Sequence, residues 1–218
     1  SVQNVAVGNY SMAANMNEAN WNTALGHYAL NDNNIGNGNT AIGHTAMSGD
    51  MTDEDVENCV AVGKGAMGGA LEEDVSGTVA IGKSALNALT SGAGNTVVGY
   101  LSGKSLTTAD YNTFVGQNTG EWLAHDTANG NVAVGFNAMG GGDESTPAGN
   151  TASYNIAIGG NAVGGTTAST TTDLTAANNV GIGWGALAEI STGSHNIAIG
   201  KDALNVNKGG ANNVEIGG

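Results

Sequence analysis

The sequence predicts an all-β protein built as a parallel β-solenoid, or β-roll, of about twelve short coils. A motif of the form Asn-x-Ala-Ile-Gly recurs along the whole chain. Large and small apolar residues alternate before each glycine, as they do in a strand. Gly, Asn, Asp and Thr fill the stretches between copies, which is typical of turns. A single repeat domain, residues 1–218, therefore accounts for the chain.

Twelve copies align on their glycine, and successive glycines lie 17 to 24 residues apart. With this glycine as position 0, position −4 is Asn in ten of the twelve copies, and positions −3 and −1 are always Val, Thr, Ile or Leu. Position −2 is usually Ala, and position +4 is Leu, Met or Val in nine of the eleven copies that reach it. The equivalent glycines are Gly8, Gly26, Gly43, Gly63, Gly82, Gly99, Gly116, Gly135, Gly159, Gly183, Gly200 and Gly217.

Each copy predicts one very short strand followed by a turn. Positions −3 and −1 point to one side of a strand and the small residue at −2 points to the other. We expect the large residues to be buried inside the coil with position +4, and the Ala face to meet another chain. The glycine turns the chain without the steric cost of a Cβ atom.

The Asn of one copy should stack on the Asn of the next and satisfy the amides along the axis. Three copies represent positions −4, −1 and 0 of this unit: Asn39, Ile42 and Gly43; Asn131, Val134 and Gly135; and Asn196, Ile199 and Gly200.

Composition excludes several functional classes. The chain has 5 Lys, no Arg and 19 acidic residues, a net charge of −14, so it lacks the basic surface that nucleic acids and anionic membranes attract. No apolar run approaches the ~20 residues of a membrane span. The single cysteine, Cys59, excludes an intrachain disulfide framework and is expected to be a buried packing residue. The sequence starts without Met and shows no signal peptide, so we expect a piece of a longer protein.

Acidic residues are concentrated in two successive loops between copies, DMTDEDVE at 50–57 and LEEDV at 71–75. The main interpretation is that both loops are solvated. The alternative is a calcium site, because carboxylates stacked on neighbouring coils repel one another unless a cation lies between them. Calcium is the one cofactor that the sequence suggests. The candidate cation ligands are Asp53, Asp55, Glu57, Glu72 and Asp74.

Other candidate sites are weaker. For the three tryptophans, Trp21, Trp122 and Trp184, burial between the chains of an oligomer is the main interpretation, and stacking on sugar rings at an exposed fibre face is the alternative. His27 and His44 share position +1 with several lysines, a column that we expect to be solvated. No HExxH or GxSxG motif occurs, and we predict that the chain is not an enzyme. The extra residues of the two longest spacings, 140–154 and 164–178, are predicted surface insertions.

The repeat N-x-A-I-G-x-x-A-L/M, present from Asn4 to Gly217, resembles the head repeats of YadA-like trimeric adhesins and, more closely, the NTAIGxxAL repeats of bacteriophage tail fibres. The last copy, NNVEIGG, resembles the closing repeat of such arrays. The resemblance implies a parallel β-roll that associates side by side as a homotrimer. It departs from the adhesin repeat in its longer spacing and in two spacings of 24 residues.

The expected function is that of a non-enzymatic structural segment, the shaft of a fibre that is extracellular or on a virion surface. The segment would either position a receptor-binding part of the fibre or itself attach to a host receptor. Its partners would be copies of itself and a cell-surface glycan, with no nucleic acid and no insertion into a membrane. Three alternatives remain open at this point: a subunit of an end-to-end extracellular filament, a carbohydrate-binding module and, third, a polysaccharide-degrading enzyme. The last would need paired carboxylates on one face, whereas the acidic residues here fall mainly in loops.

Overall fold

The computed structural model describes residues 3–13, 19–32, 36–51, 56–72, 75–123, 128–141, 150–164 and 174–218. Its regular elements are strands of three residues each, and every strand occupies positions −3 to −1 of one copy. They are β1 (Val5–Val7), β2 (Thr23–Leu25), β3 (Thr40–Ile42), β4 (Val60–Val62), β5 (Val79–Ile81), β6 (Thr96–Val98), β7 (Thr113–Val115), β8 (Val132–Val134), β9 (Ile156–Ile158), β10 (Val180–Ile182), β11 (Ile197–Ile199) and β12 (Val214–Ile216).

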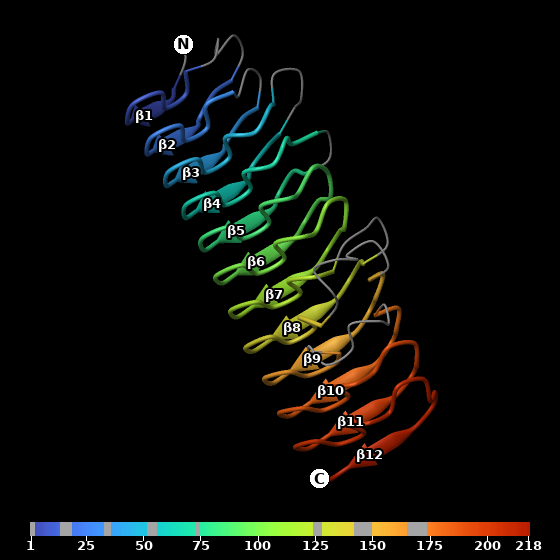
Figure 1. Ribbon diagram of the computed structural model, residues 1–218. Coiled ribbons are helices and arrows are strands. Elements are labelled where there is room, and N and C mark those ends of the chain that lie inside the picture. The colour runs from blue at the N-terminus through green and yellow to red at the C-terminus, as the bar shows by residue number, and fades with distance from the viewer. Residues whose placement is uncertain are drawn as a thin grey trace.

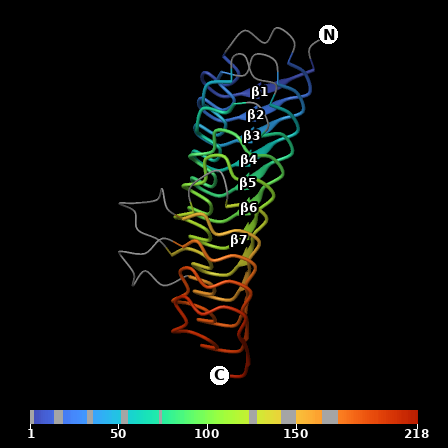
Figure 2. The same cartoon turned by 90° about the vertical axis from the view of Figure 1, so that its right-hand side faces the viewer.

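The twelve strands form one parallel sheet whose order is the order of the sequence. Pairing keeps the copies in register, so that Thr40, Ala41 and Ile42 of β3 lie opposite Val60, Ala61 and Val62 of β4. Each strand therefore belongs to one coil, and the coils are stacked like the steps of a stair with the two ends of the chain at opposite ends (Figure 1). The view at right angles shows the coils stacked along the whole length (Figure 2). The predicted parallel β-solenoid is confirmed.

The repeat glycine ends each strand and lies against the next coil. Gly43 has φ +133, and a Cβ atom on it would lie 2.6 Å from the carbonyl oxygen of Gly63. The turn that follows uses left-handed residues at positions +2 and +4, such as Tyr28 (φ 56) and Leu30 (φ 50). These conformations tighten the turn, so the chain can return beneath its own strand.

The core is a thin, continuous layer between the strands and the returning segments. Position +4 is buried as predicted, for example at Leu30, Met47 and Met139. The prediction for the strand itself is wrong, because the Ala column at position −2 is buried and the large residues at −3 and −1 face outward. Position −2 includes Ala24, Ala41, Ala61, Ala80, Ala133, Ala157 and Ala198, all with no exposed surface.

Space explains this reversal. The side chain at +4 already fills the interior of the coil, so the strand above it has room for little more than a methyl group. In the coil of β10 even a methyl group does not fit. Gly181 replaces Ala there, and a Cβ atom on it would lie 2.6 Å from the Cγ2 atom of Val163. The β-branched residues consequently lie on the outside of the sheet, where they favour the extended backbone.

Candidate functional site

A ladder of buried amides runs along the start of the strands, as predicted. The Oδ1 atom of Asn39 accepts a hydrogen bond from the backbone N–H of Cys59 in the next coil at 3.0 Å, and its Nδ2 atom donates to the carbonyl of Val56 at 2.7 Å. Asn131 does the same with the N–H of Asn155 and the carbonyl of Ala152. Each amide thus joins two coils, and buried polar groups satisfied in this way fix the register of the stack.

Cys59 and Thr78 replace Asn in this ladder. Cys59 is fully buried, and its Sγ atom donates to the carbonyl of Val75 at 3.1 Å, the position that an Asn amide would reach. Burial raises the pKa of the Cys59 thiol to about 11, although the backbone N–H groups of Thr78 and Gly77 act in the opposite direction. The thiol is therefore protonated near neutral pH and is not poised as a nucleophile.

A second polar ladder runs along position −6, and sequence reasoning missed it. Here the backbone N–H of one coil donates to the side chain of the next: Asn20 to Asn37 Oδ1 at 2.8 Å, and Asp110 to Asn129 Oδ1 at 2.7 Å. In the next coil the Oγ atom of Ser153 plays the same part, accepting a hydrogen bond from the backbone N–H of Asn129 at 3.2 Å. The signal in the sequence was the recurrence of Asn, Asp and Ser two residues before the Asn column.

The outer face of the sheet is a strip of aliphatic side chains, interrupted by one threonine in each of β2, β3, β6 and β7. We call this strip the apolar face, and it consists of positions −3 and −1 of the twelve strands. In the middle of the stack Val134, Ile156 and Ile158 of β8 and β9 are 36–40% exposed, whereas Val132 of β8 and both outward residues of β10 are half-buried. Twelve strands at about 4.8 Å make this face roughly 50 Å long. A long exposed aliphatic strip of this kind is a candidate interaction surface.

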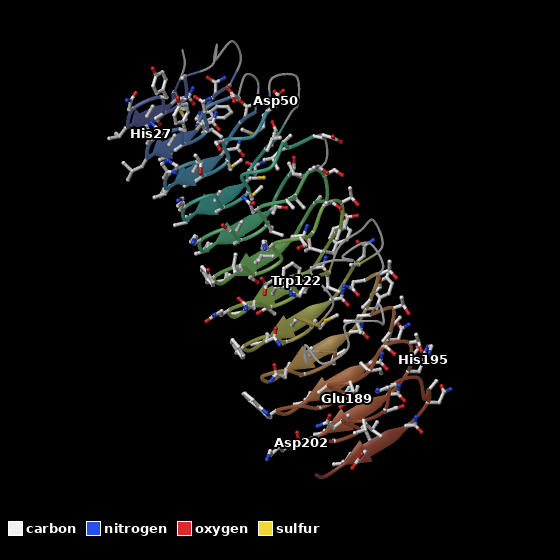
Figure 3. The ribbon with its side chains drawn as sticks, in the orientation of Figure 1. His27, Asp50, Trp122, Glu189, His195 and Asp202 are labelled. Atoms are coloured by element: carbon white, nitrogen blue, oxygen red, sulfur yellow. The ribbon has the colours of Figure 1, made fainter. Side chains whose placement is uncertain are left out.

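The two edges of the apolar face carry different columns. Figure 3 shows His27 and Asp202 on the edge where the strands end, and His195 on the opposite edge where they begin. The first edge contains position +1, which is exposed as predicted. His27 and His44 stack there with ring centroids 5.2 Å apart, and Tyr10 stacks on Tyr28 at 4.9 Å.

Aromatic residues also occupy position +1 further along the same edge, on alternate coils. They are Tyr100 after β6, Phe136 after β8 and Trp184 after β10, and they are 43%, 49% and 54% exposed. Gln117 and Gly160 occupy the coils between them. The ring of Trp184 lies over Gly160, where a Cβ atom would collide with it. We call Tyr100, Phe136 and Trp184 the aromatic row.

The three tryptophans do not form one site. Trp21 lies on the opposite edge, beside β2, and its Nε1 atom donates to Gln3 Oε1 at 2.8 Å. Trp122 is half-buried after the β7 turn, with the Lys104 ammonium 4.7 Å from a ring centroid. Only Trp184 of the three belongs to the aromatic row.

The acidic candidates give no cation site within the described residues. Glu57 belongs to the second ladder, where its Oε1 atom accepts from Asn37 Nδ2 at 3.3 Å, and Glu72 is exposed in the following loop. Asp53, Asp55 and Asp74 lie outside the described residues, as do most of the two insertions. In the described part of the chain, no group of three or more His, Cys, Asp or Glu side chains is placed to hold a metal ion.

Comparisons with known proteins identify no relative of this chain. Comparison with family models, curated proteins and solved structures found no significant match. Across the described ranges, no helix is long and apolar enough to cross a membrane. The features available for a functional argument are therefore the two polar ladders, the apolar face and the aromatic row.

Proposed function

We propose that this chain is a non-enzymatic structural segment, the shaft of an extracellular or virion-surface fibre, and that three copies associate through the apolar face. The observation that carries the proposal is the exposed aliphatic strip on a long, regular stack of coils. The resemblance of the repeat to tail-fibre and adhesin repeats supports a trimer over other assemblies. The shaft would hold receptor-binding parts of the fibre away from the particle or cell.

The physical argument for self-association is the burial of aliphatic surface. A Val or Ile side chain contributes about 1.5–3 kcal/mol when it passes from full exposure to full burial, so residues such as Ile156 and Ile158, about 40% exposed, would each gain less than half of that. The strip repeats every coil, so a second copy with the same repeat matches it along the whole length. The polar ladders lie inside the coil, so the side-chain polar groups of the face are the threonine hydroxyl groups of β2, β3, β6 and β7.

Solution mass by light scattering across a dilution series tests this proposal. We expect a constant mass of three times 21.4 kDa for the wild type. Ile158→Lys places an unpaired charge in the middle of the apolar face and should give monomers. Gln117→Lys, an exposed change outside the face, is the matched control and should remain trimeric.

The other results would each contradict a trimer formed through the apolar face. A wild-type monomer contradicts side-by-side association. A mass that rises with concentration favours the end-to-end filament instead. Loss of the trimer in Gln117→Lys but not in Ile158→Lys would place the interface at the edge of the sheet.

A further inference from the structure

We propose that the aromatic row, Tyr100, Phe136 and Trp184, binds an uncharged, extended β-1,4-linked polysaccharide, with each ring stacking on every second sugar. The inference goes beyond the proposed shaft, since it assigns a ligand to one edge of the sheet. It rests on the spacing of the rings, on the charge around them and on the rigidity of the coils that carry them.

The spacing comes from the register of the strands. The three rings occur at the same position after β6, β8 and β10, and the strands between them are paired in register. Neighbouring strands are about 4.8 Å apart, so rings on alternate coils repeat about every 9.6 Å. In an extended β-1,4-linked chain of hexoses, successive sugars are turned by about half a turn, so the chain repeats after two sugars and over a similar distance. Each ring would therefore meet an equivalent sugar face.

The row is also accessible. About half of each aromatic side chain is exposed although it is large and apolar. Gly160 allows the ring of Trp184 to lie over the preceding coil, because any Cβ atom at that position would collide with the ring. Rings that are exposed and held on a rigid scaffold are suited to stacking on the apolar faces of sugars.

The charge around the row favours a neutral ligand. Position +1 from β6 to β10 contains no charged residue. At one end of the row the Lys83 ammonium lies 5.4 Å from the centroid of the Tyr100 ring, and Lys201 lies beyond the other end. Amides occur between and beside the rings, at the exposed Gln117 and the half-buried Asn118 and Asn161, where they can hydrogen-bond hydroxyl groups. A polyanionic glycan would instead meet a chain with a net charge of −14.

The opposite edge is a poorer candidate. Tyr111 and Tyr154 lie there on alternate coils, over Gly94 and Gly130. They form only a pair, because the next alternate coil has His195 at the same position. Asp110 also precedes Tyr111, which places a carboxylate beside this edge.

Titration calorimetry of the full chain with cellohexaose and chitohexaose tests the proposal, with maltohexaose as the α-linked comparison. The decisive variant exchanges two neighbours, Gln117→Phe with Phe136→Gln. It keeps the composition and uses residue types that this column already accepts, but it changes the ring spacing from two and two coils to one and three. Tyr154→Ala is the matched control, because it removes an exposed ring from the opposite edge.

We expect at least one β-linked hexasaccharide to bind the wild type and maltohexaose to bind more weakly. The exchange variant and Phe136→Ala should each bind about tenfold more weakly, which is the effect of losing one aromatic contact. Tyr154→Ala should bind as the wild type does. Urea unfolding and solution mass should be unchanged in the exchange variant.

Several results would overturn the proposal. These are no binding of either β-linked hexasaccharide, equal binding of maltohexaose, or undiminished binding by the exchange variant. If Tyr154→Ala lowers the affinity as much as Phe136→Ala does, the sugar binds outside the aromatic row. If Phe136→Ala changes the solution mass, the row is a contact between copies and not a glycan site. The trimer test uses Ile158→Lys and is independent of these results.

Discussion

At the scale of single residues, backbone conformation and contact with the next coil decide which positions are strict. The repeat glycine meets two requirements, a φ near +130 and a backbone carbonyl directly beside its Cα atom. Positions that require only the left-handed conformation accept Asn, Tyr and Met. This difference explains why the glycine at position 0 is invariant while its neighbours vary.

We expect Gly135→Ala to destabilise the protein severely, because its Cβ atom would lie 2.7 Å from backbone atoms of Gly159 and φ is +132. The cost should exceed the ~1–3 kcal/mol of a strained backbone alone. Gly77→Asn is the control, since Gly77 has no atom within 4 Å of a new Cβ and Asn occupies the same column at Asn58 with φ 56. Urea unfolding would contradict the argument if both variants lost similar stability.

Cys59 predicts a loss of stability at alkaline pH. Its pKa is raised by burial from 9.0 to about 11, so the unfolded chain loses the thiol proton first. The contribution to stability is present below pH 9 and disappears as the pH rises towards 11, and it amounts to about 2–3 kcal/mol. The difference in the free energy of unfolding between wild type and Cys59→Ser, followed from pH 8 to 11, isolates it from tyrosine ionisation. A constant difference over this range would contradict the assignment.

At the scale of the element, the coil conserves its interior volume even where the repeat pattern fails. Gly103 and Gly120 lack the usual Leu or Met at position +4, and Phe114, at the Ala position of β7, fills the space. A Cβ atom on Gly120 would collide with the Phe114 ring, and one on Gly103 would lie 3.6 Å from it. The Phe114 ring therefore replaces the missing side chain at Gly120, and it shares the space beside Gly103 with Leu86 and Leu106.

Phe114→Ala should cost about 3–5 kcal/mol, because it leaves a cavity in a dry core. Adding Gly120→Met restores a residue type found at this position in other coils. Gly120 has φ 60, and the equivalent Met139 has φ 51, so the backbone accepts Met, and the double variant should recover a large part of the lost stability. Gly120→Met alone should destabilise, since its side chain meets the ring. A double-mutant cycle measured by urea unfolding checks the coupling, and additive effects would exclude it.

The sequence was sufficient to predict the strands, their register and the Asn ladder, because each depends on a column that recurs at a fixed place. It did not predict which face of the strand is buried. Alternation at Thr40, Ala41 and Ile42 shows only that the two faces differ, and the interior volume left by position +4 decides between them. The sequence was also sufficient to place Tyr100, Phe136 and Trp184 in one exposed column, because each follows a repeat glycine, whereas the exposure of each ring required the structure.

At the scale of the whole molecule, the stack behaves as a one-dimensional array. Every strand contacts only the strands before and after it in the described part of the chain. Stability is then a sum of coil terms and interfaces between neighbours, as in other repeat proteins. The polar ladders strengthen this coupling because each Asn bonds to the following coil and never beyond it.

This array predicts how damage spreads. Gly135→Ala disrupts the coil of β8 near the middle of the stack, and the nearest neighbours β7 and β9 lose half of their pairing. Amide hydrogen exchange should therefore lose protection most strongly from β7 to β9 and recover progressively towards β2 and β11. A globular domain with one cooperative core would instead lose protection uniformly. Uniform loss in this variant would mean that the stack, or the trimer around it, unfolds as a single unit.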